Sequence, residues 1–206
     1  MQRTVISEAL AADAPRTDIR VCGWVRTRRD SKNFVFLELN DGSCLANLQC
    51  IIDEGTPAWE KLEGVNTGAS VKIEGELVES PGKGQKWEVR AKDMAVFGLA
   101  DPESFPLQKK RHSDEFLRTI AHLRPRTNKY GAAFRIRSHA ALAVHDYFRN
   151  LGFFYVHTPI LTGSDCEGAG EMFRVTTLPV EYRPKEGQSW FADDFFGNPA
   201  SLTVSG

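Results

Sequence analysis

Apolar and polar residues alternate through much of the first hundred positions, a pattern that indicates β-structure. The pattern predicts five strands, at residues 19–25, 34–39, 45–52, 71–78 and 86–97, with one short helix at 56–62. The Asn-Asp-Gly run at 40–42 is a strong hairpin signal. Gly23 and Gly75 fall inside strands, as expected where a small barrel bends sharply.

Five strands with a helix between the third and the fourth are typical of an OB-fold, a five-stranded Greek-key β-barrel that binds oligonucleotides. We therefore expect residues 1–98 to form this barrel. Residues 99–112 lack periodicity and contain two prolines, which predicts a linker. Residues 113–206 are expected to belong to a second domain.

The second domain is expected to open with helices. Ser113 should cap a short helix, and residues 128–151 should form a long helix with an apolar stripe that Gly152 ends. The apolar run at 153–156 is expected to be a buried strand, and Pro159 lies just beyond it.

Composition limits the class of protein. The chain of 206 residues is 41% hydrophobic and 26% charged, as in an ordinary globular protein. It has no apolar run of about eighteen residues and its first twenty residues carry several charges, so we expect a cytoplasmic protein that is not in a membrane. Its four cysteines form no C-x-x-C pair, which predicts buried reduced thiols and no metal site.

Charge is distributed unevenly along the chain although the net charge is only −1. Residues 20–32 and 109–137 are strongly basic, while the segment after 165 is more acidic. Two basic zones on a nearly neutral protein indicate local contact with a polyanion. The alternative is that these residues form ordinary solvated strand and helix faces.

The second predicted strand carries two apolar sets. Phe34 and Phe36 share one face, and the aliphatic residues between and after them supply the other. If the aliphatic set fills the core, the two phenylalanines point outward beside Arg28 and Arg29. An outward aromatic ring next to arginines is a platform on which an unpaired base stacks. The alternative is that strand twist buries one or both rings.

Residues 152–161 (Gly-Phe-Phe-Tyr-Val-His-Thr-Pro-Ile-Leu) directly follow the long helix and resemble motif 1 of class II aminoacyl-tRNA synthetases. A barrel followed by this motif is similar to the aspartyl, asparaginyl and lysyl subgroup. The run at 167–173 and the segments 194–197, 202–206 and 23–30 look most like the bacterial asparaginyl members. The resemblance covers essentially the whole chain.

The resemblance implies roles for particular residues. Phe36 matches the position that stacks on the central anticodon base, and Arg29, Asn47 and Glu88 fall at or near positions that contact the anticodon. With Arg28 from the basic cluster, these residues form the predicted anticodon site.

Three further residues match positions outside the barrel. Glu167 matches a residue of the loop that closes over the amino acid, with its carboxylate facing the substrate ammonium group. Ser205 begins the strand that lines the amino-acid pocket. Pro159 belongs to motif 1, which builds the homodimer interface of the family.

The activity that the resemblance implies is the ATP- and Mg²⁺-dependent attachment of asparagine to its tRNA through an asparaginyl adenylate. The arginines of motifs 2 and 3 do not appear, so we expect an amino-terminal fragment without catalytic residues that is inactive alone. Two alternatives remain. The parent could be an aspartyl-tRNA synthetase, possibly one that charges both tRNAs, or the barrel could be a stand-alone nucleic-acid-binding module.

Overall fold

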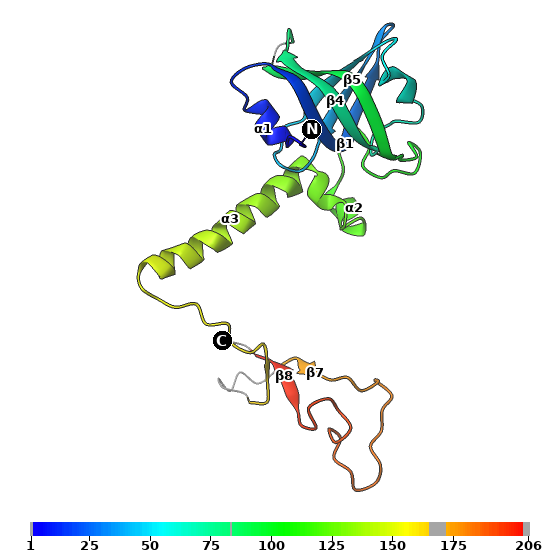
Figure 1. Cartoon of the computed structure of the whole chain (residues 1–206). Helices are drawn as coiled ribbons and strands as arrows, with labels where there is room; N and C mark the ends of the chain where they lie inside the picture. The colour runs from blue at the N-terminus through cyan, green and yellow to red at the C-terminus, as the bar shows by residue number, and fades with distance from the viewer. Residues whose placement is uncertain (1, 83, 165–171, 204–206) are drawn as a thin grey trace. The chain divides into compact units, whose positions relative to one another are not determined.

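The computed structural model describes residues 2–82, 84–164 and 172–203 (Figure 1). The chain divides into two compact units, Met1–Ala140 and Ala141–Gly206. Within the described residues, no helix has the length and apolar character needed to cross a membrane.

Five strands form a closed barrel in the first unit, in the order β1-β2-β3-β5-β4. Their bounds are β1 (Arg16–Asp30), β2 (Phe34–Asn40), β3 (Leu48–Asp53), β4 (Ser70–Glu79) and β5 (Trp87–Gly98). Strands β3 and β5 pair in parallel, and all other neighbours are antiparallel. The predicted OB-fold barrel is confirmed, with its third strand starting at Leu48.

The prediction of a helix at 56–62 is wrong about the type and the length of the helix. Only a single 3₁₀ turn forms there, η1 (Trp59–Lys61). Gly55 and Gly64 flank it with φ angles of 81° and 69°. These left-handed residues turn the backbone at both sides, so the segment between them is too short for an α-helix of several turns.

Burial alternates strictly along β2. Its three aliphatic residues are at most 2% exposed and belong to the barrel core, whereas Phe34 and Phe36 are only partly buried on the other face. The prediction that the phenylalanines lie outside the core is confirmed. The reason is that inward side chains of β1, β3, β4 and β5 already fill the small interior.

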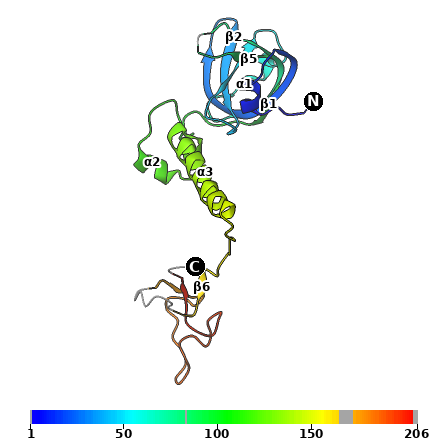
Figure 2. The same cartoon turned by 90° about the vertical axis from the view of Figure 1, so that its left-hand side faces the viewer.

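A short helix that the sequence pattern does not predict, α1 (Ile6–Leu10), packs against the barrel (Figures 1 and 2). Ile6 and Ala9 are fully buried and join the barrel core. The indole of Trp87 donates a hydrogen bond to the carbonyl oxygen of Ala12 at 2.8 Å. The amino-terminal segment is therefore part of the barrel's packing.

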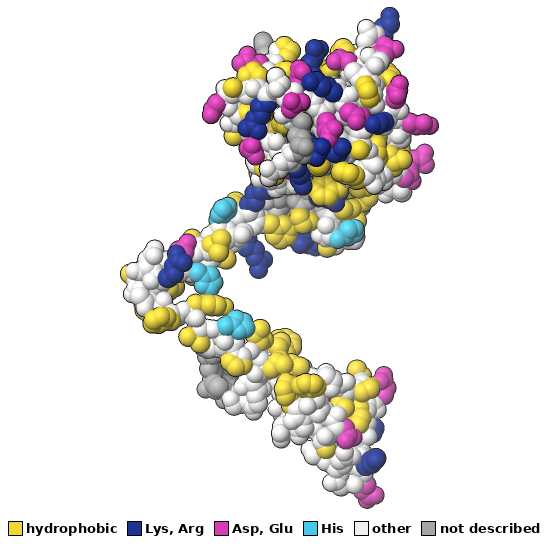
Figure 3. Space-filling view, in the orientation of Figure 1, with side chains coloured by type: hydrophobic (Ala, Val, Ile, Leu, Met, Phe, Trp, Pro, Cys, Tyr) yellow, Lys and Arg dark blue, Asp and Glu magenta, His cyan; other side chains and the backbone are white. Residues whose placement is uncertain are grey.

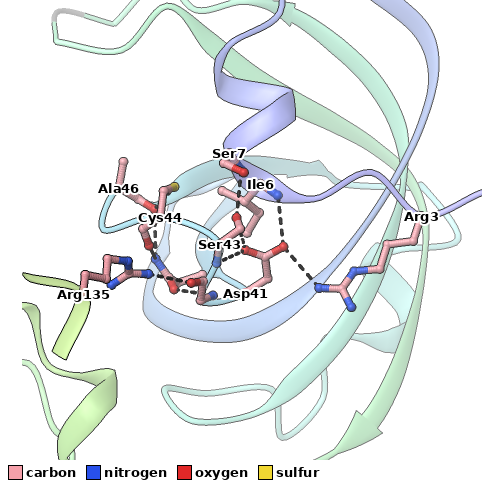
Figure 4. Close-up of polar contacts among 10 residues, drawn as sticks. Arg3, Ile6, Ser7, Asp41, Ser43, Cys44, Ala46 and Arg135 are labelled. Carbon is pink, nitrogen blue, oxygen red and sulfur yellow. Dashed lines mark hydrogen bonds and ion pairs between the residues drawn. The ribbon is translucent and has the colours of Figure 1, made fainter. Parts of the chain in front are cut away.

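The loop after β2 joins α1 to the barrel through Asp41 (Figure 4). The Asp41 carboxylate accepts hydrogen bonds from the backbone amide of Ile6 at 3.0 Å, from Arg3 at 3.1 Å and from Ser43. Burial alone would raise the pKa of Asp41, but these hydrogen bonds outweigh it and hold the pKa below its usual value. The carboxylate is thus kept ionised in its folded surroundings.

Two glycines allow close approach of neighbouring strands. A Cβ atom on Gly75 would lie 2.0 Å from the carbonyl oxygen of Arg90, and one on Gly23 would lie 2.9 Å from that of Asn40. The β4–β5 register shifts between Glu74 and Gly75. Backbone crowding at this irregularity explains why glycine occupies the position.

We expect Gly75→Ala to lower the free energy of unfolding by at least about 1–3 kcal/mol, because β4 must move away from β5. Urea unfolding followed by circular dichroism measures the loss. Gly98→Ala is the matched control, since its Cβ would meet only the Ser70 hydroxyl, at 3.3 Å. Equal stability of the Gly75 variant and the parent would contradict this account of the barrel.

Residues 99–112, where a linker is predicted, contain no helix or strand. Then follow α2 (Asp114–Thr119), the 3₁₀ turn η2 (Arg124–Arg126) and α3 (Asn128–Asn150). The Ser113 hydroxyl accepts a hydrogen bond from the Phe116 amide at 3.2 Å and so caps α2. Gly152 has a φ of 87° directly after α3, so the two predicted helices and the terminating glycine are confirmed.

The second unit holds a three-stranded antiparallel sheet in the order β6-β8-β7. Its strands are β6 (Leu161–Thr162), β7 (Arg174–Val175) and β8 (Ala200–Leu202). The buried strand predicted at 153–156 is wrong: this run has no regular structure and its side chains are 62–94% exposed. A strand needs a hydrogen-bonding neighbour, and none of the described strands pairs with it.

The cysteine prediction is only partly correct. Cys50 is buried, and burial raises the pKa of its thiol above the usual value. Cys22 and Cys44 are free thiols but only half-buried. Cys44 lies in the loop after β2. Cys166 lies outside the described residues.

Candidate nucleic-acid interface

Two rows of outward side chains cross β1, β2, β3 and β5. Strand register places Arg29, Phe36, Ile51 and Arg90 in one row and Thr27, Glu38, Gln49 and Glu88 in the next. We call these two rows the outer face. It brings together residues from four strands that are far apart in the sequence.

An aromatic and cationic cluster occupies the first row. The Phe36 ring meets Phe34 edge-on with centroids 5.0 Å apart, and the guanidinium carbon of Arg29 lies 4.4 Å from the Phe36 centroid. This distance is within the range of a cation–π contact. The prediction that an arginine lies beside outward phenylalanines is therefore confirmed for Arg29.

Arg29 makes no ion pair within the described part of the chain. Basic side chains elsewhere on the barrel do: Arg20 lies 2.7 Å from Glu74, and Lys92 lies 2.7 Å from Glu76. Figure 3 shows acidic and basic side chains interspersed over the visible side of the barrel. Arg29 therefore keeps an uncompensated charge next to an accessible ring, which suits a phosphate or a base.

Glu88 anchors a polar cluster in the second row. It is only 4% exposed, and its Oε2 accepts hydrogen bonds from Gln49 at 3.1 Å, Ser80 at 2.7 Å and Gln85 at 3.2 Å. Three donors on one oxygen fix the carboxylate in place. Glu88 is therefore a rigid acceptor set into the outer face.

Asn47 lies just before β3 and is tied to the same row. Its amide donates to Glu38 at 3.3 Å, and its carbonyl oxygen accepts from Asn40 at 3.2 Å. The Asn40 side-chain amide also donates hydrogen bonds to the backbone carbonyl oxygens of Cys44 and Ala46. Asn47 is exposed, so its amide lies at the surface, where it can contact a base.

Arg28 is not brought to this face. It pairs in register with buried Leu37, and its guanidinium donates to the carbonyls of Leu62 and Val65 at 3.0 and 2.7 Å and to Asp30. These bonds join the end of β1 to the segment after η1. The structure thus gives Arg28 a role in packing, and its place in the anticodon site remains an untested prediction.

Glu38 and Gln49 complete the second row but are not among the site residues predicted from the sequence. A signal was available, because both occupy the same alternating positions as Phe36 in two predicted strands. What the sequence lacked was the pairing of β3 with β5, which places Gln49 opposite Glu88.

Two residues are predicted for the amino-acid site and one for the dimer motif. Glu167 and Ser205 fall outside the described residues. Pro159 is exposed in the second unit, two positions before β6. Its neighbours form an apolar surface: Phe153, Phe154, Tyr155 and Val156 are mostly exposed, as are Tyr147 and Leu151 of α3.

Comparison with known proteins identifies both halves of the chain. Residues 19–97 match the family model of the OB-fold nucleic acid binding domain, and residues 113–186 match that of class II tRNA synthetases (D, K and N). The asparagine–tRNA ligases of Nitratidesulfovibrio vulgaris (strain DP4) and Oleidesulfovibrio alaskensis are 70% and 71% identical to this chain over the whole length of the chain. The chain spans about 45% of each of these relatives.

A solved structure shares the fold. The asparaginyl-tRNA synthetase of Pyrococcus horikoshii, complexed with asparaginyl-adenylate, aligns with all of this chain at a TM-score of 0.78 and 21% identity. The chain covers 43% of that protein.

The fold and the family matches define an OB-fold nucleic-acid-binding barrel followed by the start of a class II tRNA synthetase domain. More specifically, the chain belongs to the asparagine–tRNA ligase family and corresponds to its amino-terminal part.

Proposed function

We propose that this chain supplies the anticodon-binding part of an asparagine–tRNA ligase. The intact enzyme would use ATP to join asparagine to its tRNA through an asparaginyl adenylate. Identity near 70% to asparagine–tRNA ligases over the whole chain supports asparagine over the aspartyl alternative. The class II match over residues 113–186 supports a synthetase over a stand-alone barrel module.

The observation that carries the proposal is the Arg29–Phe36 pair, in which a guanidinium group without an ion pair in the described structure lies against an outward aromatic ring. We propose that Phe36 stacks on the central base of the anticodon while Arg29 contacts a neighbouring base or phosphate. Asn47 presents both a donor and an acceptor, and Glu88 presents a fixed acceptor, so both can distinguish base edges by hydrogen bonding.

We expect Phe36→Ala to weaken binding of the asparagine anticodon stem–loop by about 1–3 kcal/mol without loss of the fold. Fluorescence anisotropy with labelled RNA measures the change. Phe97→Ala is the matched control, because Phe97 is an exposed phenylalanine at the far end of β5 and outside the outer face. Equal RNA affinity of the Phe36 variant and the parent would contradict the proposal that Phe36 stacks on a base.

The amino-acid site of the intact enzyme rests on the family match. We propose that Glu167 pairs with the ammonium group of asparagine and that Ser205 begins one wall of the pocket. Class II synthetases use ATP, and the proposed enzyme would use it with Mg²⁺. No group of three or more His, Cys, Asp or Glu side chains that could hold a metal ion occurs within the described ranges.

We propose that the apolar surface of the second unit takes part in a homodimer interface. A cavity of about 1170 Å³ lies along residues 144–158 of this unit. Phe154 lines this cavity and is 94% exposed, and Figure 3 shows hydrophobic side chains gathered along this part of the chain. A contiguous apolar surface of this kind marks a surface that another protein covers.

We expect Phe154→Asp to weaken self-association of the chain at least about tenfold, because a charge must be desolvated at the contact. Sedimentation velocity over a range of protein concentrations measures association. Val180→Asp is the control: Val180 is 91% exposed in the same unit but does not line the cavity. Parallel behaviour of both variants would mean that general hydrophobicity, not this surface, drives association.

The domain boundaries predicted from the sequence are also part of the proposal: an anticodon-binding domain at 1–98, a linker at 99–112 and synthetase residues from 113 onward. The compact units divide at a different place, inside α3. The barrel therefore packs with the first turns of the helix that opens the synthetase region. The proposed location of the enzyme is the cytoplasm.

A further inference from the structure

A second concave site lies in the first unit and borders the outer face, because Thr27 and Asn47 are among its lining residues. A cavity of about 600 Å³ is bounded by β1, by the linker and by the residues that begin α3. Trp24, Arg26 and Thr27 come from β1, while Thr127 and Lys129 come from the start of α3. The volume is in the range of small-molecule pockets.

The lining of this cavity carries charge of one sign. Among its described lining residues there is no aspartate or glutamate, and there are six cationic side chains: Arg26, Lys109, Lys110, Arg111, Arg126 and Lys129. Lys129 is compensated by Asp114 at 2.5 Å. None of the other five makes an ion pair with a described carboxylate, so the cavity holds an excess of positive charge.

Two of the cations are fixed in the wall. Arg26 donates to the carbonyl oxygen of Arg126 at 2.6 Å, and the guanidinium carbon of Arg126 lies 4.2 Å from the centroid of the Trp24 ring. Burial lowers the pKa of both arginines, and the charge of Arg26 lowers that of Arg126 further. Two like charges are thus held close together and partly out of water, an arrangement that an anion stabilises.

His112 supplies a second observation that points to a ligand. It lines the cavity, and its Nε2 is buried without a hydrogen-bond partner in the described structure. Its ring packs against Phe116 with centroids 5.3 Å apart, so its position is set by packing. A buried ring nitrogen requires a partner, and an oxygen or hydroxyl group of a bound ligand would provide one.

A neighbouring cavity of about 520 Å³ shares Trp24, Arg26 and Arg126 as a common wall. It also has no described acidic residue in its lining, and it adds Arg135 and His122. Arg135, however, already donates to the carbonyl of Gly42 at 2.5 Å (Figure 4). The first cavity carries more cations, because Lys109, Lys110 and Arg111 of the linker line it and do not line the second.

We propose that the cavity between β1 and residues 105–129 binds a small, multiply charged phosphoanion, of the class of pyrophosphate or the phosphate tail of a nucleotide. Arg26 and Arg126 would bind it at the wall with planar, directional donors. Lys109, Lys110 and Arg111, which are exposed, would close over it from the linker. This inference stands on the cavity alone and does not depend on the proposed anticodon binding.

Isothermal titration calorimetry of the whole chain with pyrophosphate, at constant ionic strength set with chloride, tests the proposal. We expect saturable 1:1 binding that weakens at least about tenfold in Arg126→Gln and in Lys110→Gln. Arg126 also packs on Trp24, so its variant is checked for an unchanged unfolding midpoint. Lys110 is exposed, so its variant should fold normally in any case. Lys61→Gln removes one charge at a site that lines neither cavity and should bind as the parent does.

Absence of saturable pyrophosphate binding, or binding that neither cavity variant weakens, would overturn the proposal. A second arm uses the anticodon stem–loop. If only RNA binding depends on Arg126 and Lys110 and pyrophosphate does not bind, the cavity belongs to an RNA surface and the small-anion proposal fails. The Phe36→Ala comparison reports on the outer face separately, so the two proposals fail independently.

Discussion

The structure depends on the fact that β2 carries two apolar sets while the barrel has room inside for one. Its aliphatic residues are taken into the core with the inward side chains of the other four strands. Phe34 and Phe36 therefore lie outside the core, where part of each ring stays exposed to water, which is unfavourable for an apolar side chain. A rigid barrel that presents aromatic rings beside an arginine without an ion pair in the described structure is suited to binding unstacked bases.

A bulge in β1 decides which arginine joins that face. The register with β2 shifts between Val25 and Thr27, so one residue is left over and the side-chain alternation changes phase. Arg29 therefore lies beside Phe36, and Arg28 turns to the backbone carbonyls after η1. The extra residue, Arg26, instead reaches the turn before α3 and forms the wall of the cationic cavity. One irregularity in a strand thus separates three neighbouring arginines into three roles.

Much of the barrel could be predicted because period-two burial, the hairpin signal at 40–42 and the Ser113 cap are local properties of the sequence. What could not be predicted depends on partners. Three features arise only when distant segments meet: the bulge at Arg26, the hydrogen bonds donated to Glu88, and the hydrogen bond from the Ile6 amide of α1 to Asp41. The expected strand at 153–156 failed for the same reason: its composition is that of a buried strand, but no described strand pairs with it.

We propose that the outer face distinguishes one RNA sequence from another. The most direct test is to compare binding of the chain to the asparagine anticodon stem–loop and to the same stem–loop with its central uridine replaced. The account predicts a clear preference for the uridine loop that persists as salt is raised, since stacking and base-edge hydrogen bonds are less sensitive to salt than phosphate contacts are. Equal affinity for both loops, falling together with salt, would show that the face only attracts phosphate, and would contradict its role as an anticodon-binding site.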